Sequence, residues 1–186
     1  MSFMRPLLLA CTLAAISGTA FAADAPAPPL SKVFDSQVRQ VESEIGSLAE
    51  AMPADKYDFA PTNGEFKTVR TFSLQMTHIA TVIYEVSSAA LGEKCPVATG
   101  KNENGDADIR GKDAVVKYLK GSFALAHRAA NALTAANMMD MLQSPFGDGK
   151  TTRINLVSII AWHSFDHYGQ SVVYARMNKI VPPASR

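Results

Sequence analysis

The chain has 186 residues with a formal net charge of +1, and 47% of the residues are hydrophobic. That length and apolar content suit one domain with its own hydrophobic core. The near-neutral charge lacks the basic excess typical of nucleic-acid-binding proteins, so we expect no nucleic-acid partner.

The first 23 residues are typical of a secretory signal peptide. Residues 1–5 are short and basic, residues 6–16 are apolar, and residues 20–22 are small-aromatic-small as in a cleavage site. The apolar run is too short for stable membrane insertion. We therefore expect cleavage near Ala22 or Ala23 and a periplasmic or secreted protein that is not stably inserted in a membrane.

Cleavage would also change the charge and the cysteine content. It would remove Arg5 and Cys11, which leaves 17 basic and 17 acidic residues and a single cysteine, Cys95. One cysteine cannot form an internal disulfide, even in an oxidising compartment. Because Cys95 lies in a polar loop, we interpret it as an incidental free thiol.

A proline-rich linker at residues 24–30 precedes four stretches with apolar residues at helical spacing. Ser31 is the expected N-cap of the first helix, and Gly92 the expected stop of the second. The four helices are expected at residues 31–52, about 68–91, 113–137 and 156–177. No stretch convincingly predicts a strand, so the sequence predicts an all-α four-helix bundle over residues 31–183.

Three features outside the helical pattern also carry structural expectations. Trp162 is expected to pack between helices. Gly169 lies inside a helix and suggests that a neighbouring element approaches closely there. Met138, Met139 and Met141 are expected to fill the core at a helix end.

The face of the last helix that would pack against the other helices carries polar residues where apolar ones are usual. His163 and His167 lie one turn apart on the face that would meet the other helices, followed there by Gln170. Buried polar groups need partners, and a metal ion is the simplest partner for two such imidazoles. His78, beside the apolar stripe of the second helix, is the third candidate ligand. Three imidazoles would leave a coordination position open to water or substrate, although buried histidines can also simply bond to neighbouring groups.

Gln170 and Glu85 are the candidate catalytic residues. Gln170 could orient a ligand or a metal-bound water, or it could form a hydrogen bond across the bundle. Glu85, two turns from His78, is the nearest candidate general base. Asp166 could support an imidazole from another helix or be a solvated surface carboxylate. His127 is interpreted as a histidine bonded to neighbouring groups rather than a fourth ligand.

Several motifs resemble the DinB/YfiT-like superfamily. HxxxH (163–167) is followed by YGQ (168–170), VYAR (173–176) and IVPP (180–183), which together resemble the last helix of that family. YDFAPT (57–62) and MTHIA (76–80) resemble its first ligand region. The resemblance covers residues 30–183, but residues 66–69 lack the tryptophan and the acidic residue found in many relatives, and the export signal is a second departure.

The resemblance implies a bundle, often dimeric, that holds a divalent metal, zinc or nickel, through three histidines. Carried over by position, these ligands are His78, His163 and His167. It also implies metal-dependent hydrolysis, or transfer involving small thiols, on a small-molecule substrate of unknown identity. Export favours hydrolase-like chemistry over thiol transfer. The alternatives are a periplasmic metal or small-ligand binding protein without turnover, and a purely structural bundle.

Overall fold

The computed structural model describes residues 26–186, and residues 26–29 are exposed without regular secondary structure. The predicted signal peptide lies outside the described residues. The helices are α1 (Leu30–Ala51), α2 (Phe72–Leu91), α3 (Gly111–Asn131) and α4 (Arg153–Met177), with short 3-10 helices at Ala54–Lys56, Lys101–Glu103 and Pro183–Ser185. Of the helices described, none is both long and apolar enough to cross a membrane.

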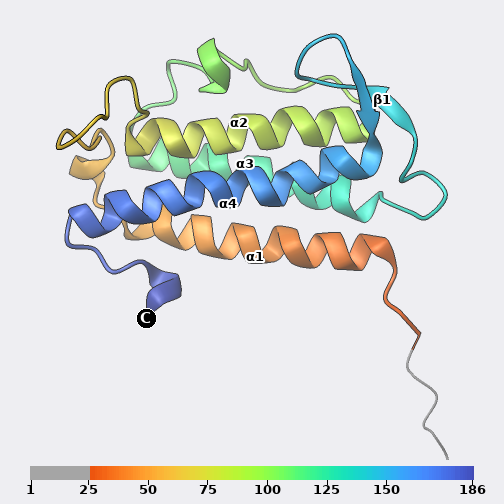
Figure 1. The fold of residues 1–186 in the computed structure, drawn as a ribbon, viewed down its shortest axis with the longest axis horizontal. Helices are drawn as coiled ribbons and strands as arrows, with labels where there is room; N and C mark the ends of the chain where they lie inside the picture. The colour runs from red at the N-terminus through yellow and green to blue at the C-terminus, as the bar shows by residue number, and fades with distance from the viewer. Residues whose placement is uncertain (1–25) are drawn as a thin grey trace, which may run out of the picture.

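The predicted four-helix bundle is confirmed. Both α1 and α2 pack against α3 and against α4, so α1 and α2 occupy one diagonal of the bundle. Figure 1 shows α1 and α4 running in one direction while α2 and α3 run in the other. Because α2 and α3 are parallel, the chain needs a long return, residues 92–110, between them. That return brings a loop alongside α2, where it becomes part of the candidate site.

Apolar residues at spacings of three and four form the core. On α1, Val38, Val41, Ile45 and Leu48 are each at most 1% exposed. Burying one such side chain contributes about 1.5–3 kcal/mol, so this seam is a main source of bundle stability.

The loop before α2 fixes where that helix begins. The side chain of Thr71 accepts a hydrogen bond from the amide of Leu74 at 3.2 Å. The carbonyls of Phe59 and Tyr57 accept from the amides of Phe72 and Ser73 at 2.9 and 2.7 Å. These bonds satisfy amides of the first turn that have no partner within the helix. At the other end Gly92 adopts φ 71°, the left-handed conformation expected of a glycine stop.

Three predicted helix starts are wrong, and one of them is that of α4, which begins at Arg153 instead of residue 156. α1 begins at Leu30, and the carbonyl of Pro29 accepts from the amides of Lys32 and Val33, so Ser31 is not the N-cap. The fixed backbone angle of proline already suits a helix start. α2 begins four residues later than expected, because Thr68 has φ 70°, which a right-handed helix does not allow.

The segment between α3 and α4 also differs from the prediction. α3 ends at Asn131 instead of residue 137, and a hairpin follows in which β1 (Met141–Gln143) pairs antiparallel with β2 (Lys150–Thr152). These strands have three residues each and are largely exposed, so they leave almost no hydrophobic pattern in the sequence.

Of the three packing expectations outside the helical pattern, those for Trp162 and for the methionines are wrong, and the one for Gly169 is not met within this chain. Trp162 is 58% exposed, and two of the three methionines, Met139 and Met141, are 61% and 56% exposed. A Cβ added at Gly169 would meet nothing within 4 Å among the described residues, so no element of this chain approaches there. These residues mark surface, not core.

A buried acidic group ties the start of α1 to the end of α3. Asp35 is 5% exposed and accepts hydrogen bonds from His127 Nδ1 at 2.6 Å, from Asn131 Nδ2 at 2.9 Å, and from Arg39. His127 also bonds to Glu42 through Nε2 at 3.0 Å. As predicted, this histidine is bonded to its neighbours and lies outside the histidine cluster described below.

This network makes stability depend on pH in two directions. Burial alone would raise the pKa of Asp35, but the bonds from His127 and Arg39 outweigh it and lower that pKa. Burial alone would lower the pKa of His127, but the bonds to Glu42 and Asp35 outweigh it and raise that pKa. The Asp35 contribution is lost as pH falls below about 4, and the His127 contribution is lost as pH rises above about 6.5.

We expect His127→Leu to lower the free energy of unfolding on the order of 1–3 kcal/mol at pH 5.5, because it leaves a buried carboxylate short of a charged donor. The loss should be smaller at pH 9 than at pH 5.5, because the contribution of the protonated histidine is lost as pH rises through its raised pKa. Urea unfolding at both pH values measures this. Arg128→Leu, which removes an exposed ion pair with Glu93, is the matched control and should cost under about 1 kcal/mol. An equal loss at both pH values for His127→Leu would contradict the assignment.

Candidate metal centre

Three histidines from two helices converge inside the bundle. His78 comes from α2, and His163 and His167 come from successive turns of α4, which packs against α2. The ring centroid of His78 lies 5.0 Å from that of His163 and 4.6 Å from that of His167. The centroids of the two α4 rings are 4.6 Å apart. The spacing of four residues places both α4 rings on the face that meets α2.

The distances between nitrogens fit a shared ion. Each histidine offers one ring nitrogen, and these atoms all lie within 4.8 Å of one another. The Nε2 atoms of His78 and His163 are 3.2 Å apart. Two nitrogens bound to one tetrahedral zinc ion at 2.0–2.1 Å would be roughly 3.3 Å apart, so this pair already has the required separation.

A loop carbonyl fixes the ring of His78. Its Nδ1 lies 3.0 Å from the carbonyl oxygen of Glu103, an acceptor, so Nδ1 carries the proton and Nε2 keeps its free lone pair. Arg70 holds that loop by donating to Asn104 Oδ1 at 2.7 Å and to the carbonyl of Asn102 at 3.0 Å. Nothing in the sequence pattern indicated this support, because the acceptor is a main-chain oxygen.

A chain of amides fixes the ring of His167. Its Nδ1 donates to Gln75 Oε1 at 2.7 Å, and Gln75 Nε2 donates to Gln170 Oε1 at 3.0 Å. Because the Gln75 oxygen accepts that proton, Nε2 of His167 is left unprotonated and available as a ligand. Gln170 therefore forms the hydrogen bond across the bundle that was one of its two expected roles. Gln75 lies three positions before His78, one turn away on α2, and the sequence alone assigned it no role.

His163 is held differently. Its Nδ1 is buried and has no hydrogen-bond partner among the described residues, although the side chain as a whole is partly exposed. Its remaining nitrogen, Nε2, faces His78. A buried ring nitrogen without a partner is costly, and it makes His163 the least restrained of the three rings.

Burial keeps all three rings neutral near neutral pH. It lowers the pKa of His163 to about 3, with the charges of His167 and His78 adding to the effect. Burial and then His78 lower the pKa of His167 to about 4. The pKa of His78 is also lowered, by burial and by Arg70. Neutral imidazole is the form that binds metal, so the cluster is ready to act as a set of nitrogen ligands.

The acidic candidates lie at different distances from the cluster. Glu85 is seven residues beyond His78, about 10 Å along α2, and it lines a separate cavity. Burial, with a smaller effect from Glu103, raises its pKa to about 7. Asp166 is much closer, with Oδ2 4.0 Å from His167 Nε2, and its side chain is 67% exposed. The structure thus brings Asp166 to the cluster and leaves Glu85 outside it.

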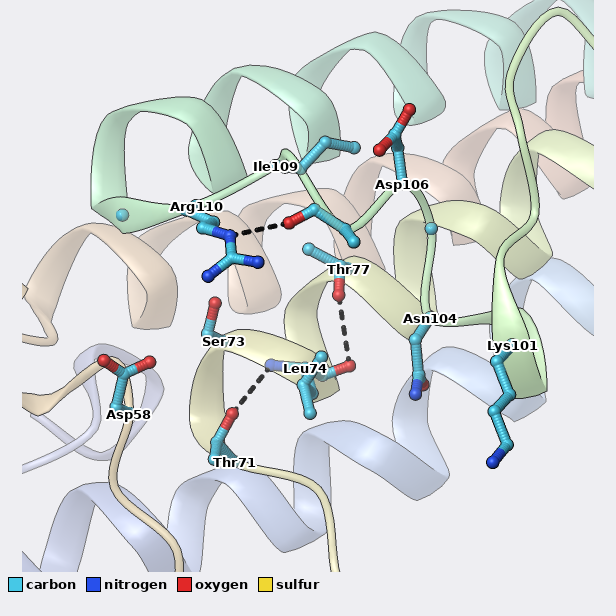
Figure 2. Close-up of a pocket in the computed structure, with 13 residues that line it drawn as sticks. Asp58, Thr71, Ser73, Leu74, Thr77, Lys101, Asn104, Asp106, Ile109 and Arg110 are labelled. Carbon is cyan, nitrogen blue, oxygen red and sulfur yellow. Dashed lines mark hydrogen bonds between the residues drawn. The ribbon is translucent and has the colours of Figure 1, made fainter.

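A cavity of about 480 Å³ is lined in part by Lys101 and Asn104, residues of the loop that holds His78. Figure 2 shows it between the first turns of α2, with Ser73 and Thr77, and the return loop, with Asn104 and Arg110. Its lining carries acidic Asp58 and Asp106 as well as basic Lys101 and Arg110, and it does not include the clustered histidines. Asn104, which is bonded to Arg70, links this wall to the support of the cluster.

Comparison with known proteins identifies one family. A sequence model of the DinB superfamily matches residues 37–171, a span that contains all three clustered histidines. The fold is similar to that of a DinB-like protein from Bacillus subtilis, with a TM-score of 0.58 and 18% sequence identity, covering 79% of this chain and 92% of that one. At that identity the structural likeness bears on the fold alone. No curated protein matches the sequence.

The amide chain predicts the proton positions in the metal-free protein. Nitrogen-15 NMR of the imidazoles should show His167 and His78 in the form protonated at Nδ1. Gln75→Leu removes the acceptor and should release His167 from that form while leaving His78 unchanged, since the carbonyl of Glu103 still holds it. Gln143→Leu, a glutamine of the hairpin, is the matched control. A His167 spectrum unaffected by Gln75→Leu would contradict the assignment.

Proposed function

Because the chain belongs to the DinB superfamily, we propose that His78, His163 and His167 together hold one divalent metal ion, zinc or nickel. The observation that carries the proposal is the fixed orientation of two rings. Each of His78 and His167 donates its Nδ1 proton to an oxygen, from Glu103 and from Gln75, and each is left with an unprotonated Nε2. Metal-binding histidines are ordinarily held by such bonds.

The proposed activity is metal-dependent hydrolysis of a small molecule, or transfer involving a small thiol. A divalent ion at this position would polarise a substrate and ease the loss of a proton from a bound water or thiol. Asp166, 4.0 Å from His167 Nε2, is the carboxylate best placed to accept that proton. It takes the place of Glu85, which lies about 10 Å along α2 from His78. Gln170 acts by holding Gln75, as a positioning residue.

A metal or small-ligand binding protein without turnover is the second candidate. It is favoured by the 67% exposure of the Asp166 side chain, because a general base works best when it is held out of bulk water beside the proton that it accepts. The two candidates share the metal site and differ only in catalysis.

We also propose that the protein acts outside the cytoplasm, in the periplasm or after secretion. Support comes from the basic, apolar and small-residue segments of residues 1–23. Hydrolase-like chemistry is then favoured over transfer to a thiol, since small thiols are kept reduced mainly inside the cell.

The metal proposal predicts stoichiometric zinc or nickel in untagged protein purified without chelators. His163→Ala should abolish it, because two nitrogens bind an ion far more weakly than three. Gln75→Leu should weaken metal affinity roughly 10–100-fold. His127→Gln is the control, because it also removes one histidine but at a position outside the cluster. The metal content of this variant should equal that of the wild type. Metal that persists in His163→Ala would remove the proposed site.

The metal-loaded protein can then be screened against esters, amides and thiol conjugates to separate the two candidates. Turnover that is lost in both His163→Ala and Asp166→Asn identifies an enzyme that uses this carboxylate. Full metal content without turnover of any of these classes favours the binding protein.

We further propose a homodimer formed through the outer face of α4. Trp162, Phe165, Gly169 and Val173 lie on one stripe of that helix, and Trp162, Phe165 and Val173 are 58%, 36% and 52% exposed. Gly169 leaves open space in this stripe, which would let a second helix approach closely. A second copy presents the same stripe, as a two-fold interface requires.

Sedimentation equilibrium should therefore show a dimer for the wild type. Trp162→Glu places a charge in the stripe and should weaken association at least roughly tenfold, which corresponds to about 1.4 kcal/mol. Val181→Glu changes an equally exposed residue beyond the end of α4 and should leave the dimer intact. A monomeric wild type, or equal effects of the two variants, would exclude this interface.

A further inference from the structure

A second cavity, of about 410 Å³, lies at the far end of α2, between that helix and the hairpin. Its lining includes Glu85, Ser88 and Ala89 of α2, Leu142 and Pro145 from the hairpin, and Cys95. Its size is within the range of small-molecule sites. It is separate from the histidine cluster, because Glu85 is about 10 Å beyond His78 along α2.

Two polar groups in this cavity need a partner. Ser88 is 2% exposed, and its hydroxyl has no hydrogen-bond partner within the part of the chain that the structure describes. The same holds for Oε2 of Glu85, a buried oxygen of a half-buried residue. Buried polar atoms are almost always satisfied in folded proteins, by protein, water or ligand. Both residues line the cavity, so a group bound in it is a candidate partner for these atoms.

The charged residues around the cavity favour a ligand that carries a positive charge. Its lining contains Glu85 and Glu93 and, among the described residues, no lysine or arginine. Glu93 already accepts a hydrogen bond from Arg128 at 2.6 Å, whereas Glu85 Oε2 has no hydrogen-bond partner among the described residues. The cavity also lies at the C-terminal end of α2, where the helix dipole favours positive charge. Carboxylates and phosphates are disfavoured there.

We propose that this cavity binds a small organic ammonium ion with an apolar body. The ammonium group donates to Glu85 Oε2 and to the hydroxyl of Ser88, which satisfies both unpartnered atoms. The apolar body packs between Ala89 on one side and Leu142 and Pro145 on the other. Primary amines fit best, because their three protons can serve two acceptors at once.

The state of Glu85 before binding is consistent with this role. Burial and the charge of Glu103 raise the pKa of Glu85 to about 7, so without a cation the carboxyl is partly protonated at neutral pH. An ammonium ion nearby would favour the ionised form. A bound ammonium ion thus pairs with the carboxylate of Glu85 and does not leave an unpaired charge in the cavity.

The test uses the full-length protein after removal of any signal sequence, with 2-phenylethylammonium as the probe. 2-Phenylethanol and 3-phenylpropionate carry the same apolar body with a neutral and a negative group. Backbone amide NMR shifts of Ser88 and Gly92 report binding, and the alkylation rate of Cys95 by iodoacetamide reports occupancy independently. We expect saturable binding of the ammonium ion, slower alkylation of Cys95, and at least roughly tenfold weaker binding of both controls.

Glu85→Gln keeps the shape of the side chain and should weaken ammonium binding at least roughly tenfold. Glu93→Gln is the matched control, because Glu93 is already paired with Arg128, and it should change binding less than about threefold. His163→Ala should leave binding unchanged, which separates this site from the proposed metal centre. The proposal is overturned if the ammonium ion does not saturate the site, if either control ligand binds as tightly, or if Glu85→Gln binds like the wild type.

Discussion

Two imidazoles, each held by a hydrogen bond from Nδ1 to an oxygen, are the constraint on which the candidate site depends. A buried histidine with both nitrogens free would cost stability and would have no defined proton position. Here the carbonyl of Glu103 and the amide of Gln75 settle that position for His78 and His167. Both rings then direct an unprotonated nitrogen toward the space shared with His163. The chemistry proposed for this protein depends on the proton of each ring being on Nδ1, which leaves Nε2 free to bind a metal ion.

The helix directions make this arrangement possible. Because α2 and α3 are parallel, the chain between them must return along the bundle, and this return supplies Glu103 beside His78. Arg70, just before α2, holds the same loop through Asn102 and Asn104. The hydroxyl of Tyr174 donates to the carbonyl of Arg70 at 3.1 Å, which ties the end of α4 to that support. The return loop, the segment before α2 and the end of α4, which are distant in sequence, therefore act together to fix the ring of His78.

Helical spacing in the sequence was enough to predict four helices and to place His163 and His167 on one face, because apolar seams and an i, i+4 pair leave a strong pattern. His78 was only a candidate on spacing, and the resemblance to the DinB/YfiT-like superfamily is what joined it to the other two. The supports of those rings could not be read in the same way. Glu103 acts through its main chain, which every residue possesses, and the role of Gln75 depends on how α2 and α4 face one another. Trp162 was expected between helices because large aromatic residues pack well there, but it lies on a second apolar stripe of α4, with Phe165 and Val173, that this chain leaves exposed. The hairpin strands are too short and exposed to leave a pattern.

The most direct test of the central claim is X-ray absorption spectroscopy of the zinc-loaded protein, compared with His78→Ala. The account predicts that the wild-type ion is surrounded by imidazole nitrogens at about 2.0–2.1 Å, with outer-shell scattering from three rings. The His78→Ala spectrum should lose the signal of one ring. A wild-type ion coordinated mainly by oxygen, or a spectrum that His78→Ala leaves unchanged, would show that the three histidines do not share an ion.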